Sequence, residues 1–560
     1  MTNLVDFVRA ADGNGAVLEN YEIFSKASQI VTSVSDYYSR RGPLTSDHEI
    51  RTREAIGDCA ERYQTKLSRI VQDNEVAEEA RSRIQLLKED KQTRPVLLLM
   101  SAHQPNLFAY SGVMKKIILL ACIEQILRTK WLEESYHGDV VCFYGFADHD
   151  FVHNKWVRSA EIVSPIRRDG LLRYSVKIDQ KQMYLPTNRI QKPNEELLES
   201  WQAQTKGWIS ENLSLAKKYL RGRQNTSIDL NALYEAYGNS EDFWNLVRRA
   251  HDIADNLAEF SSLLLSAVAQ EKWKLPIVFA NFSDCFKFFP NEYLWLLQNR
   301  ETFKAKVEDN EAKMKLHGID TGLANDIGEV SPLWLKCECG SKYRLELKSD
   351  AVIGRCARCS SDLSLTFAEL ESLVAENPER IEPRSIAMPI VFSKAVGMSC
   401  YVGGIGSLGY LMHSASVSAA LKVMFPPTPF WYSEDEFMSL QRLAAYAEID
   451  RMRDTYLPKS TDSDLDPLGL ARAIQTRLAG PIDSSVDRKP AELERDRQLL
   501  GRILSKNGYG TTSCMIDYAV NVSLEKSGEQ WLRFLLSDGK LLASIHMTSV
   551  YEFHGQQASM

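Results

Sequence analysis

Short apolar runs in this chain alternate with longer amphipathic stretches, and this pattern predicts an α/β protein. The runs 96–100 and 140–144 are continuously apolar or aromatic, which is typical of strands that are buried on both faces. Residues 275–281, 398–402 and 429–432 predict further strands of the same kind. Strands covered on both faces favour a parallel sheet with helices on either side.

Amphipathic stretches between the strands predict the helices. Residues 46–92 are charged and carry apolar side chains at roughly helical spacing, so they predict helices before the first strand. Residues 193–270 are rich in Leu, Trp, Glu and Arg and predict several inserted helices, and residues 286–316 predict more. Residues 531–536 and 541–547 predict two late strands around a turn.

The pattern divides the chain into a core with two insertions. A chain of 560 residues is too long for one hydrophobic core, so several units are expected. The expected segments are an N-terminal helical segment (1–93), a Rossmann-like core in three pieces (94–192, 273–332 and 364–458), a helical insertion (193–272), a zinc-ribbon insertion (333–363) and a small C-terminal α+β region (468–560).

Charge and composition narrow the class of protein. The chain carries 74 acidic and 67 basic residues, a net charge of -7, and so has no overall attraction for nucleic acid or an anionic membrane. Its apolar runs fall short of the roughly 18 residues that cross a bilayer, and its first thirty residues do not resemble a secretion signal. The ten cysteines do not suggest a disulfide framework. We expect a cytoplasmic protein that binds small molecules.

Four cysteines form two close pairs, Cys337 with Cys339 and Cys356 with Cys359. The pairs flank the sequence KYRLELKSDAVIGR, which predicts a hairpin. Two sulfurs from each turn can complete a closed tetrahedral site, and four thiolates leave no open coordination position. We therefore predict a structural zinc ion in a ribbon, with a redox pair or unrelated cysteines as the alternatives.

A polar cluster follows the first predicted strand, and it contains His103, Gln104 and Asn106. Ligands of parallel α/β sheets bind beyond the carboxyl ends of the strands, so this cluster is a candidate site. His103 can donate to a phosphate or a developing oxyanion near the positive end of the next helix, where Lys115 and Lys116 could supply countercharge. The alternative for His103 is a side chain that only stabilises the turn.

A second polar cluster follows the second strand and contains Asp148, His149, Asp150 and Asn154. A carboxylate beside a histidine can fix its tautomer and raise its basicity, which suits a general base that deprotonates an amine. Asp148 and Asp150 could instead bind Mg²⁺. The structural alternative is a helix start that is capped by one of these two carboxylates.

A glycine loop follows the strand at 398–402. Tyr401 precedes Gly403, Gly404 and Gly406, and glycines in such a turn let backbone N–H groups approach a ligand closely. The spacing from Gly404 through Gly406 to residue 409 matches the dinucleotide-binding fingerprint. No acidic ribose-binding residue is evident at the expected place, so the match is weak evidence by itself.

Together these motifs resemble the bacillithiol biosynthesis cysteine-adding enzyme family. The likeness rests on 103–108 with Gly112 and Lys115, on 147–151 with Asn154, and on 376–384 followed by 401–406, and it covers roughly residues 95–435. The resemblance implies a core similar to class I aminoacyl-tRNA synthetases, with helical insertions and a coiled coil that supports a homodimer. The implied enzyme is an amide-forming ligase that joins the carboxylate of cysteine, or another amino acid, to the amine of an acceptor such as glucosaminyl malate. ATP is the expected co-substrate, with Mg²⁺.

The resemblance also assigns roles to individual residues. His103 and Gln104 would line the site of the phosphates or the acyl intermediate, and Asp148, His149 and Asp150 would handle the amine. The remaining assignments to substrate or nucleotide binding are Asn106, Lys115, Asn154, Tyr401, Gly403, Gly404 and Gly406. The cysteine pairs and the region after 460 depart from the family, so the acceptor is left open.

Two other functions stay open at this point. A synthetase-like protein that binds RNA or tRNA without chemistry would show salt-dependent affinity, but the acidic composition does not favour it. A zinc-dependent hydrolase would need an open metal site near His103. One class of zinc hydrolases begins its metal site with the sequence Ala-His-Pro-Asp-Asp. In this chain Gln104-Pro105-Asn106 follows the histidine, so the two carboxylates that would bind the metal are missing.

Overall fold

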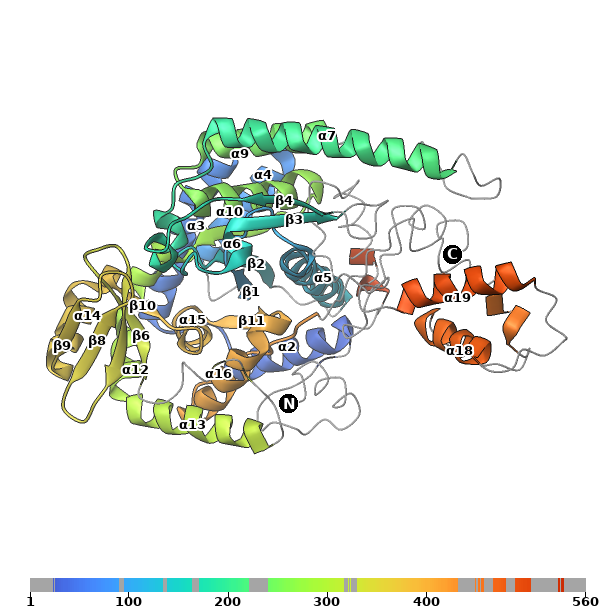
Figure 1. Cartoon of the computed structure of the whole chain (residues 1–560). Coiled ribbons are helices and arrows are strands. Elements are labelled where there is room, and N and C mark those ends of the chain that lie inside the picture. The colour runs from blue at the N-terminus through green and yellow to red at the C-terminus, as the bar shows by residue number, and fades with distance from the viewer. Residues whose placement is uncertain are drawn as a thin grey trace.

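The computed structural model shows a mixed α/β body with helices around a central sheet (Figure 1). The description covers residues 24, 26–89, 95–133, 138–163, 171–220, 240–316, 321, 323, 330–431, 449, 452–453, 455–457, 467–479, 489–504, 532–533 and 535–537.

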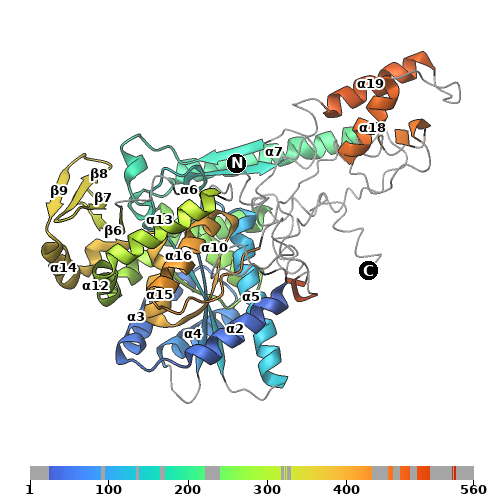
Figure 2. The same cartoon turned by 90° about the horizontal axis from the view of Figure 1, so that it is seen from below.

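Four parallel strands form the central sheet, which lies among helices in the view of Figure 2. They are β1 (Val96–His103), β2 (Asp139–Phe146), β5 (Val278–Asn281) and β11 (Met398–Val402), in the spatial order β11-β1-β2-β5. The chain therefore steps from β1 to β2 to β5 in one direction and then adds β11 on the other side of β1, as doubly wound sheets do. The predicted parallel sheet is confirmed. The strand predicted at 429–432 is wrong for the described residues, because there only Phe430 forms a single bridge, with Gly403.

Alternate residues of each central strand enter two different hydrophobic cores. Leu97 and Leu99 belong to the core that contains α5 (Ser111–Glu133), whereas Leu98 and Met100 belong to the core that contains α15 (Ala387–Val396). Burial on both faces explains why these strands read as continuous apolar runs in the sequence.

Helices occupy the regions that were predicted from amphipathic spacing. Capping signals explain several of the starts: Ser46 accepts a hydrogen bond from the His48 N–H, and Asp73 accepts one from the Val76 N–H. The longer helices of the main body that are not named above are α2 (Ala27–Arg41), α3 (Asp47–Leu67), α4 (Asn74–Lys88), α7 (Glu195–Leu220), α9 (Ser240–Ile253), α10 (Leu257–Ala267), α12 (Pro290–Gln298), α13 (Arg300–Leu316), α14 (Phe367–Glu376) and α16 (Leu408–Ala420).

A separate antiparallel sheet carries the cysteine pairs, at the left of Figure 1. Its strands lie in the order β10 (Ile381–Pro383), β6 (Val330–Lys336), β7 (Lys342–Leu347), β8 (Val352–Cys356) and β9 (Asp362–Leu365). The predicted hairpin between the cysteine pairs is the β7–β8 pair. We call this five-stranded sheet the ribbon.

The C-terminal region contains helices where it is described. α18 (Pro467–Ala479) and α19 (Pro490–Leu504) share a small hydrophobic core of their own. The strand predicted at 531–536 is wrong, because residues 532–533 and 535–536 are helical. Its apolar residues are consecutive rather than alternating, and Leu and Arg favour helices. The strand predicted at 541–547 lies outside the described residues. No helix in the described ranges is long and apolar enough to cross a membrane.

Candidate functional site

The three predicted polar loops lie at one edge of the central sheet. β1 ends at His103, β2 ends just before Asp148, and β11 ends just before Gly403. Because these strands are parallel, their carboxyl ends share one edge. The direction of the strand order reverses between β1 and β11, and ligands of doubly wound sheets bind in the crevice at such a reversal.

Gln104 connects the first polar cluster to the second. Its Nε2 donates to Oδ2 of Asp150 at 2.9 Å, and its Oε1 accepts from Nδ2 of Asn154 at 3.0 Å. A carboxylate can only accept, so the contact with Asp150 fixes which way the Gln104 amide points. The Asp150 side chain is 39% exposed and remains accessible from solvent. Asn154, rather than Asp148 or Asp150, caps the short helix α6 (Lys155–Arg158), so the capping alternative for these carboxylates is wrong.

His103 is held as a neutral imidazole. Its Nδ1 lies 3.0 Å from the carbonyl oxygen of Gln104, which can only accept, so Nδ1 carries the proton. Nε2 then accepts from the hydroxyl of Tyr110 at 3.3 Å. Burial and the positive charge of Lys116 lower the pKa of His103 to about 3. Asn106 is 4% exposed, and neither polar atom of its side chain has a hydrogen-bond partner within the described part of the chain.

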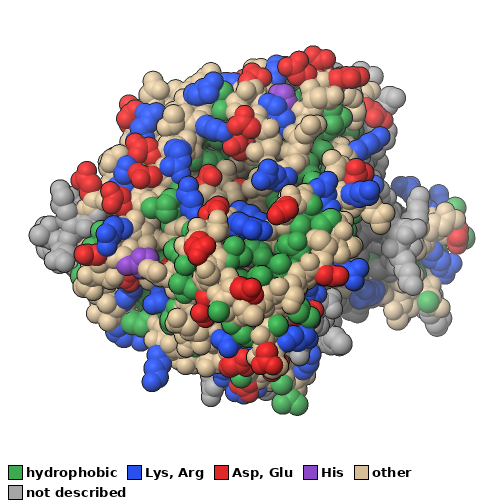
Figure 3. All heavy atoms as spheres, turned by 90° about the vertical axis from the view of Figure 1, so that its left-hand side faces the viewer, with side chains coloured by type: hydrophobic (Ala, Val, Ile, Leu, Met, Phe, Trp, Pro, Cys, Tyr) green, Lys and Arg blue, Asp and Glu red, His purple; other side chains and the backbone are tan. Residues whose placement is uncertain are grey.

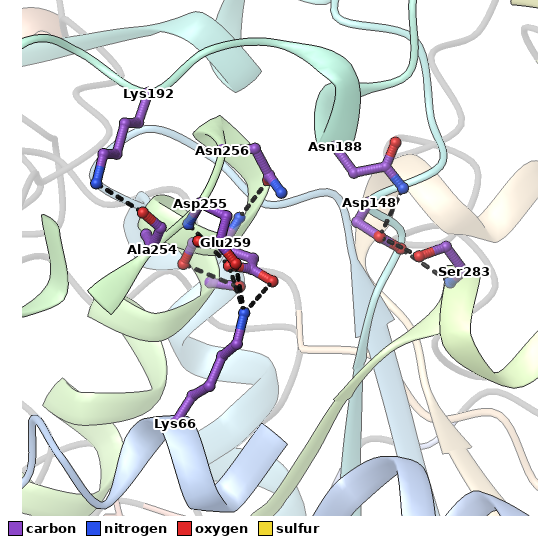
Figure 4. A network of polar contacts seen from close by, with 10 residues as sticks. Lys66, Asp148, Asn188, Lys192, Ala254, Asp255, Asn256, Glu259 and Ser283 are labelled. Atoms are coloured by element: carbon purple, nitrogen blue, oxygen red, sulfur yellow. Dashed lines mark hydrogen bonds and ion pairs between the residues drawn. The ribbon is translucent and has the colours of Figure 1, made fainter. Parts of the chain in front are cut away.

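Asp148 is an anchor between elements, as Figure 4 shows. One carboxylate oxygen accepts from the backbone N–H of Ser283 at 3.0 Å, and the other accepts from the Ser283 hydroxyl and from Nδ2 of Asn188. The side chain is buried, and burial raises its pKa to about 6. Both oxygens are committed to protein donors, so Asp150 is the carboxylate of this cluster that faces outward. Ser283 and Asn188 were absent from our sequence-based candidates; Ser283 could have been found because it follows the third strand of the sheet.

His149 lies behind Asp150 in a buried position. Its Nε2 is 3.5 Å from Oδ1 of Asp150, and its ring meets the edge of Phe286 at 4.6 Å between centroids. Burial and then the charge of Lys342 lower its pKa to about 4. His149 is therefore a neutral ring at pH 7.

The glycine loop gives Lys116 access to the edge of the sheet. The Lys116 Nζ donates to the carbonyl oxygen of Ala102 at 2.9 Å, directly before His103. A Cβ on Gly404 would come within 2.7 Å of the Lys116 Cε, so a glycine at this position makes room for the lysine. Burial lowers the pKa of Lys116 to about 7. Lys115 lies differently, with its Nζ 4.9 Å from the centroid of the Trp431 ring, so Lys116 is the lysine that reaches the polar loops.

The other residues of the glycine loop have different environments. A Cβ on Gly403 would meet Leu411 at 2.6 Å, so this glycine lets α16 pack closely. A Cβ on Gly406 would meet nothing within 4 Å, and this residue is exposed. Tyr401 is 2% exposed, and burial raises the pKa of its hydroxyl well above the ordinary value.

The four ribbon cysteines form a group that fits one metal ion. Their sulfurs lie within 4.8 Å of one another; Cys339 and Cys356 are 3.5 Å apart, and Cys337 and Cys359 are 3.7 Å apart. A tetrahedral zinc site with Zn–S bonds of about 2.3 Å places its sulfurs about 3.8 Å apart. A disulfide would need about 2.0 Å. Gly340 has a φ of 89°, which lets the first turn close around the site.

Acid should destabilise the fold through the two buried histidines. The folded pKa values of His103 and His149 lie below the ordinary 6.5. Below pH 6.5 these histidines therefore bind protons in the unfolded chain while they stay neutral in the folded chain. This stabilisation is complete above pH 6.5 and is lost as the pH falls toward 4. Asp148 has the opposite effect, because its folded pKa lies above the ordinary 3.8 and it binds a proton in the folded chain first as the pH falls. This offsets part of the stability that the histidines lose in acid.

The variant His149→Gln tests this pH dependence. We expect the contribution of His149 to fall by about 3 kcal/mol between pH 6.5 and pH 4, so the variant should lose less stability over that range than the parent. Denaturant unfolding at pH 7, 5.5 and 4 measures the difference. An equal loss of stability in the two proteins would show that the pKa of His149 is not lowered in the folded state.

No protein-family model matches this chain, and no curated protein matches it at a significant level.

Proposed function

We propose that this protein is an ATP-dependent, amide-forming ligase that joins the carboxylate of cysteine, or another amino acid, to the amine of a small acceptor. The supporting observation is the edge where the strand order reverses between β1 and β11, since Lys116, His103, Gln104 and Asp150 gather there. A doubly wound sheet with such an edge is compatible with a core like that of class I aminoacyl-tRNA synthetases. The resemblance to the bacillithiol biosynthesis family supplies the substrate class, with glucosaminyl malate as the candidate acceptor.

The residues at this edge suit an anionic ligand on one side and an amine on the other. Burial lowers the pKa of Lys116 to about 7, and a phosphate bound beside β1 would hold its ammonium in the charged form. The positive end of α16, which follows the glycine loop, would stabilise the phosphates as well. The half-exposed carboxylate of Asp150 would hold the amine of the acceptor and accept its proton. Neutral His103 would accept a hydrogen bond from the ligand at Nε2, in place of the one from Tyr110, without adding charge. ATP, bound with Mg²⁺, would supply the activation of the amino-acid carboxylate.

The charge distribution favours a small-molecule substrate over RNA. On the face shown in Figure 3, at the ribbon end, acidic and basic side chains are mixed around apolar patches instead of forming a basic stripe. The net charge of -7 agrees with this mixture. Among the described residues, the four ribbon cysteines are the one group of three or more His, Cys, Asp or Glu side chains close enough to share a metal ion, and His103 does not belong to it. A cytoplasmic location and a homodimer remain predictions.

The full-length protein, incubated with Mg²⁺, ATP, each amino acid and a mixture of small amines, should release AMP or ADP in an amino-acid-dependent manner. Mass spectrometry should detect an acceptor that gains the mass of one amino acid residue. The variant Gln104→Ala should lower turnover by about 100-fold, because it releases both Asp150 and Asn154 from their fixed positions. The matched control is Gln204→Ala on α7, an exposed residue whose amide donates a hydrogen bond to Ser200 of the same helix.

Two results would contradict this proposal. One is the absence of nucleotide release with every amino acid tested. The other is full turnover in both Gln104→Ala and Lys116→Met, since the second variant removes the cation that is proposed to hold the phosphates.

A further inference from the structure

The loop that carries Asp148 and Asp150 is held from outside the central sheet by residues Gln182–Arg189, which we call the bridging segment. The Asn188 N–H donates to the Asp148 carbonyl at 3.0 Å, and the Thr187 N–H and hydroxyl both donate to the Asp150 carbonyl at 2.9 Å. In the other direction, the Val152 N–H donates to the Leu185 carbonyl at 3.0 Å. With the side-chain bond from Asn188 to Asp148, five hydrogen bonds join two segments that are distant in sequence.

The other side of the bridging segment rests on the metal-binding turn of the ribbon. The hydroxyl of Ser341, which is fully buried, donates to the carbonyl of Tyr184 at 2.6 Å. Ser341 in turn accepts from the Cys337 N–H at 2.8 Å through its carbonyl, so it belongs to the turn that presents the first cysteine pair. Leu185 and Arg189 line a cleft of about 480 Å³ together with this turn.

The ribbon also touches the loop directly. The Phe151 ring packs edge-on against Trp334 of β6 at 5.9 Å, and Nζ of Lys342 on β7 lies 5.2 Å from the centroid of the same ring. The loop from Asp148 to Phe151 is therefore enclosed between the bridging segment and the ribbon. Disorder in the cysteine turn would remove support from both sides of it.

We infer that metal binding by the four cysteines positions Asp148 and Asp150, with Ser341 and the bridging segment as the connection. Without the ion, the turns at Cys337 and Cys356 lose the link that closes them, because small metal ribbons depend on the ion for their fold. Ser341 then no longer fixes Tyr184, and the backbone bonds from Thr187 and Asn188 open more often. This inference goes beyond the proposed function, since it holds whatever ligand the site binds.

Amide hydrogen exchange of the full-length protein, with zinc bound or removed by a chelator, tests the inference without an activity assay. Zinc removal should speed exchange in residues 147–153 and 184–190 while residues 96–102 of β1 keep their protection. Unchanged exchange in 147–153 and 184–190 would overturn the inference. Equal loss of protection in β1 would also overturn it, because the effect would then be global unfolding.

Two variants separate the connection from the metal site itself. Ser341→Ala should keep one zinc ion and yet speed exchange in 184–190 by about fivefold, the effect of one lost hydrogen bond. Its control is Ser372→Ala on α14, an exposed residue whose hydroxyl donates to Glu376 of the same helix. Because coupling is reciprocal, Asn188→Ala should weaken zinc binding by about fivefold in competition with a chelator. The inference would be overturned if zinc-bound Ser341→Ala exchanged its amides as slowly as the parent protein and Asn188→Ala bound zinc as tightly as the parent.

Discussion

Cys356→Ser is expected to abolish zinc binding and to unfold the ribbon. The sulfur of Cys356 lies 3.5 Å from that of Cys339, and a serine hydroxyl in its place is a far poorer ligand than a thiolate. Metal binding contributes on the order of 10 kcal/mol to the folding of isolated zinc-finger peptides. The ribbon strands also bury apolar side chains, such as Leu345 and Val352, in the core that they share with the central sheet. The ion therefore adds to the stability that this core supplies, and we expect the ribbon to unfold before the central sheet once the ion is lost.

Metal analysis and thermal unfolding measure this effect. The parent should hold one zinc ion per chain, and Cys356→Ser should hold none and should show an early unfolding transition of the ribbon. Cys400→Ala is the control, since Cys400 is buried in β11 away from the metal group and its loss should leave the zinc content at one. A full zinc ion in Cys356→Ser would mean that these four cysteines do not form the site.

Glu382→Gln is expected to destabilise the protein by about 3–5 kcal/mol, because it leaves a buried lysine without its counterion. Glu382 and Lys342 are 1% and 2% exposed, with 2.8 Å between Oε2 and Nζ, and Lys336 lies 3.2 Å from the other oxygen. Burial by itself raises the pKa of Glu382. The charge of Lys342 outweighs this effect and lowers the pKa to about 2. The pair lies next to the loop that carries Asp148 and Asp150, since Nζ of Lys342 is 5.2 Å from the centroid of the Phe151 ring.

Denaturant unfolding at pH 7 measures this loss. The exposed pair Arg355 and Asp362 in the same ribbon is 4.0 Å apart, so the control Asp362→Asn should change stability by less than about 0.5 kcal/mol. The folded pKa of Glu382 lies below its ordinary 4.5, so the advantage of the parent should persist above pH 4.5 and vanish as the pH falls toward 2. A loss no larger than that of the control would show that water reaches the pair.

Sequence patterns predicted the central strands and the cysteine group well because these depend on local signals. A strand buried on both faces is a continuous apolar run, and a metal ribbon is two close cysteine pairs around a hairpin. The prediction of a strand at 531–536 was wrong, because a short apolar run does not distinguish a strand from a helix. The sequence could not show that Lys116, and not Lys115, reaches the polar loops. Adjacent helical residues point about 100° apart, and spacing alone does not orient the helix.

By itself, the sequence determined the parallel sheet, the polar loops at its carboxyl edge and the four cysteines that the structure brings together as a candidate metal site. Only the tertiary structure decided that Asp148 is an anchor and that Asp150 faces outward, because Ser283 and Asn188 lie 135 and 40 residues away from Asp148 along the chain. The pairing of Lys342 with Glu382 and the connection through Ser341 are of the same kind. Periodicity reports which side chains are buried, whereas the partner of a buried polar group is fixed by how distant elements pack together.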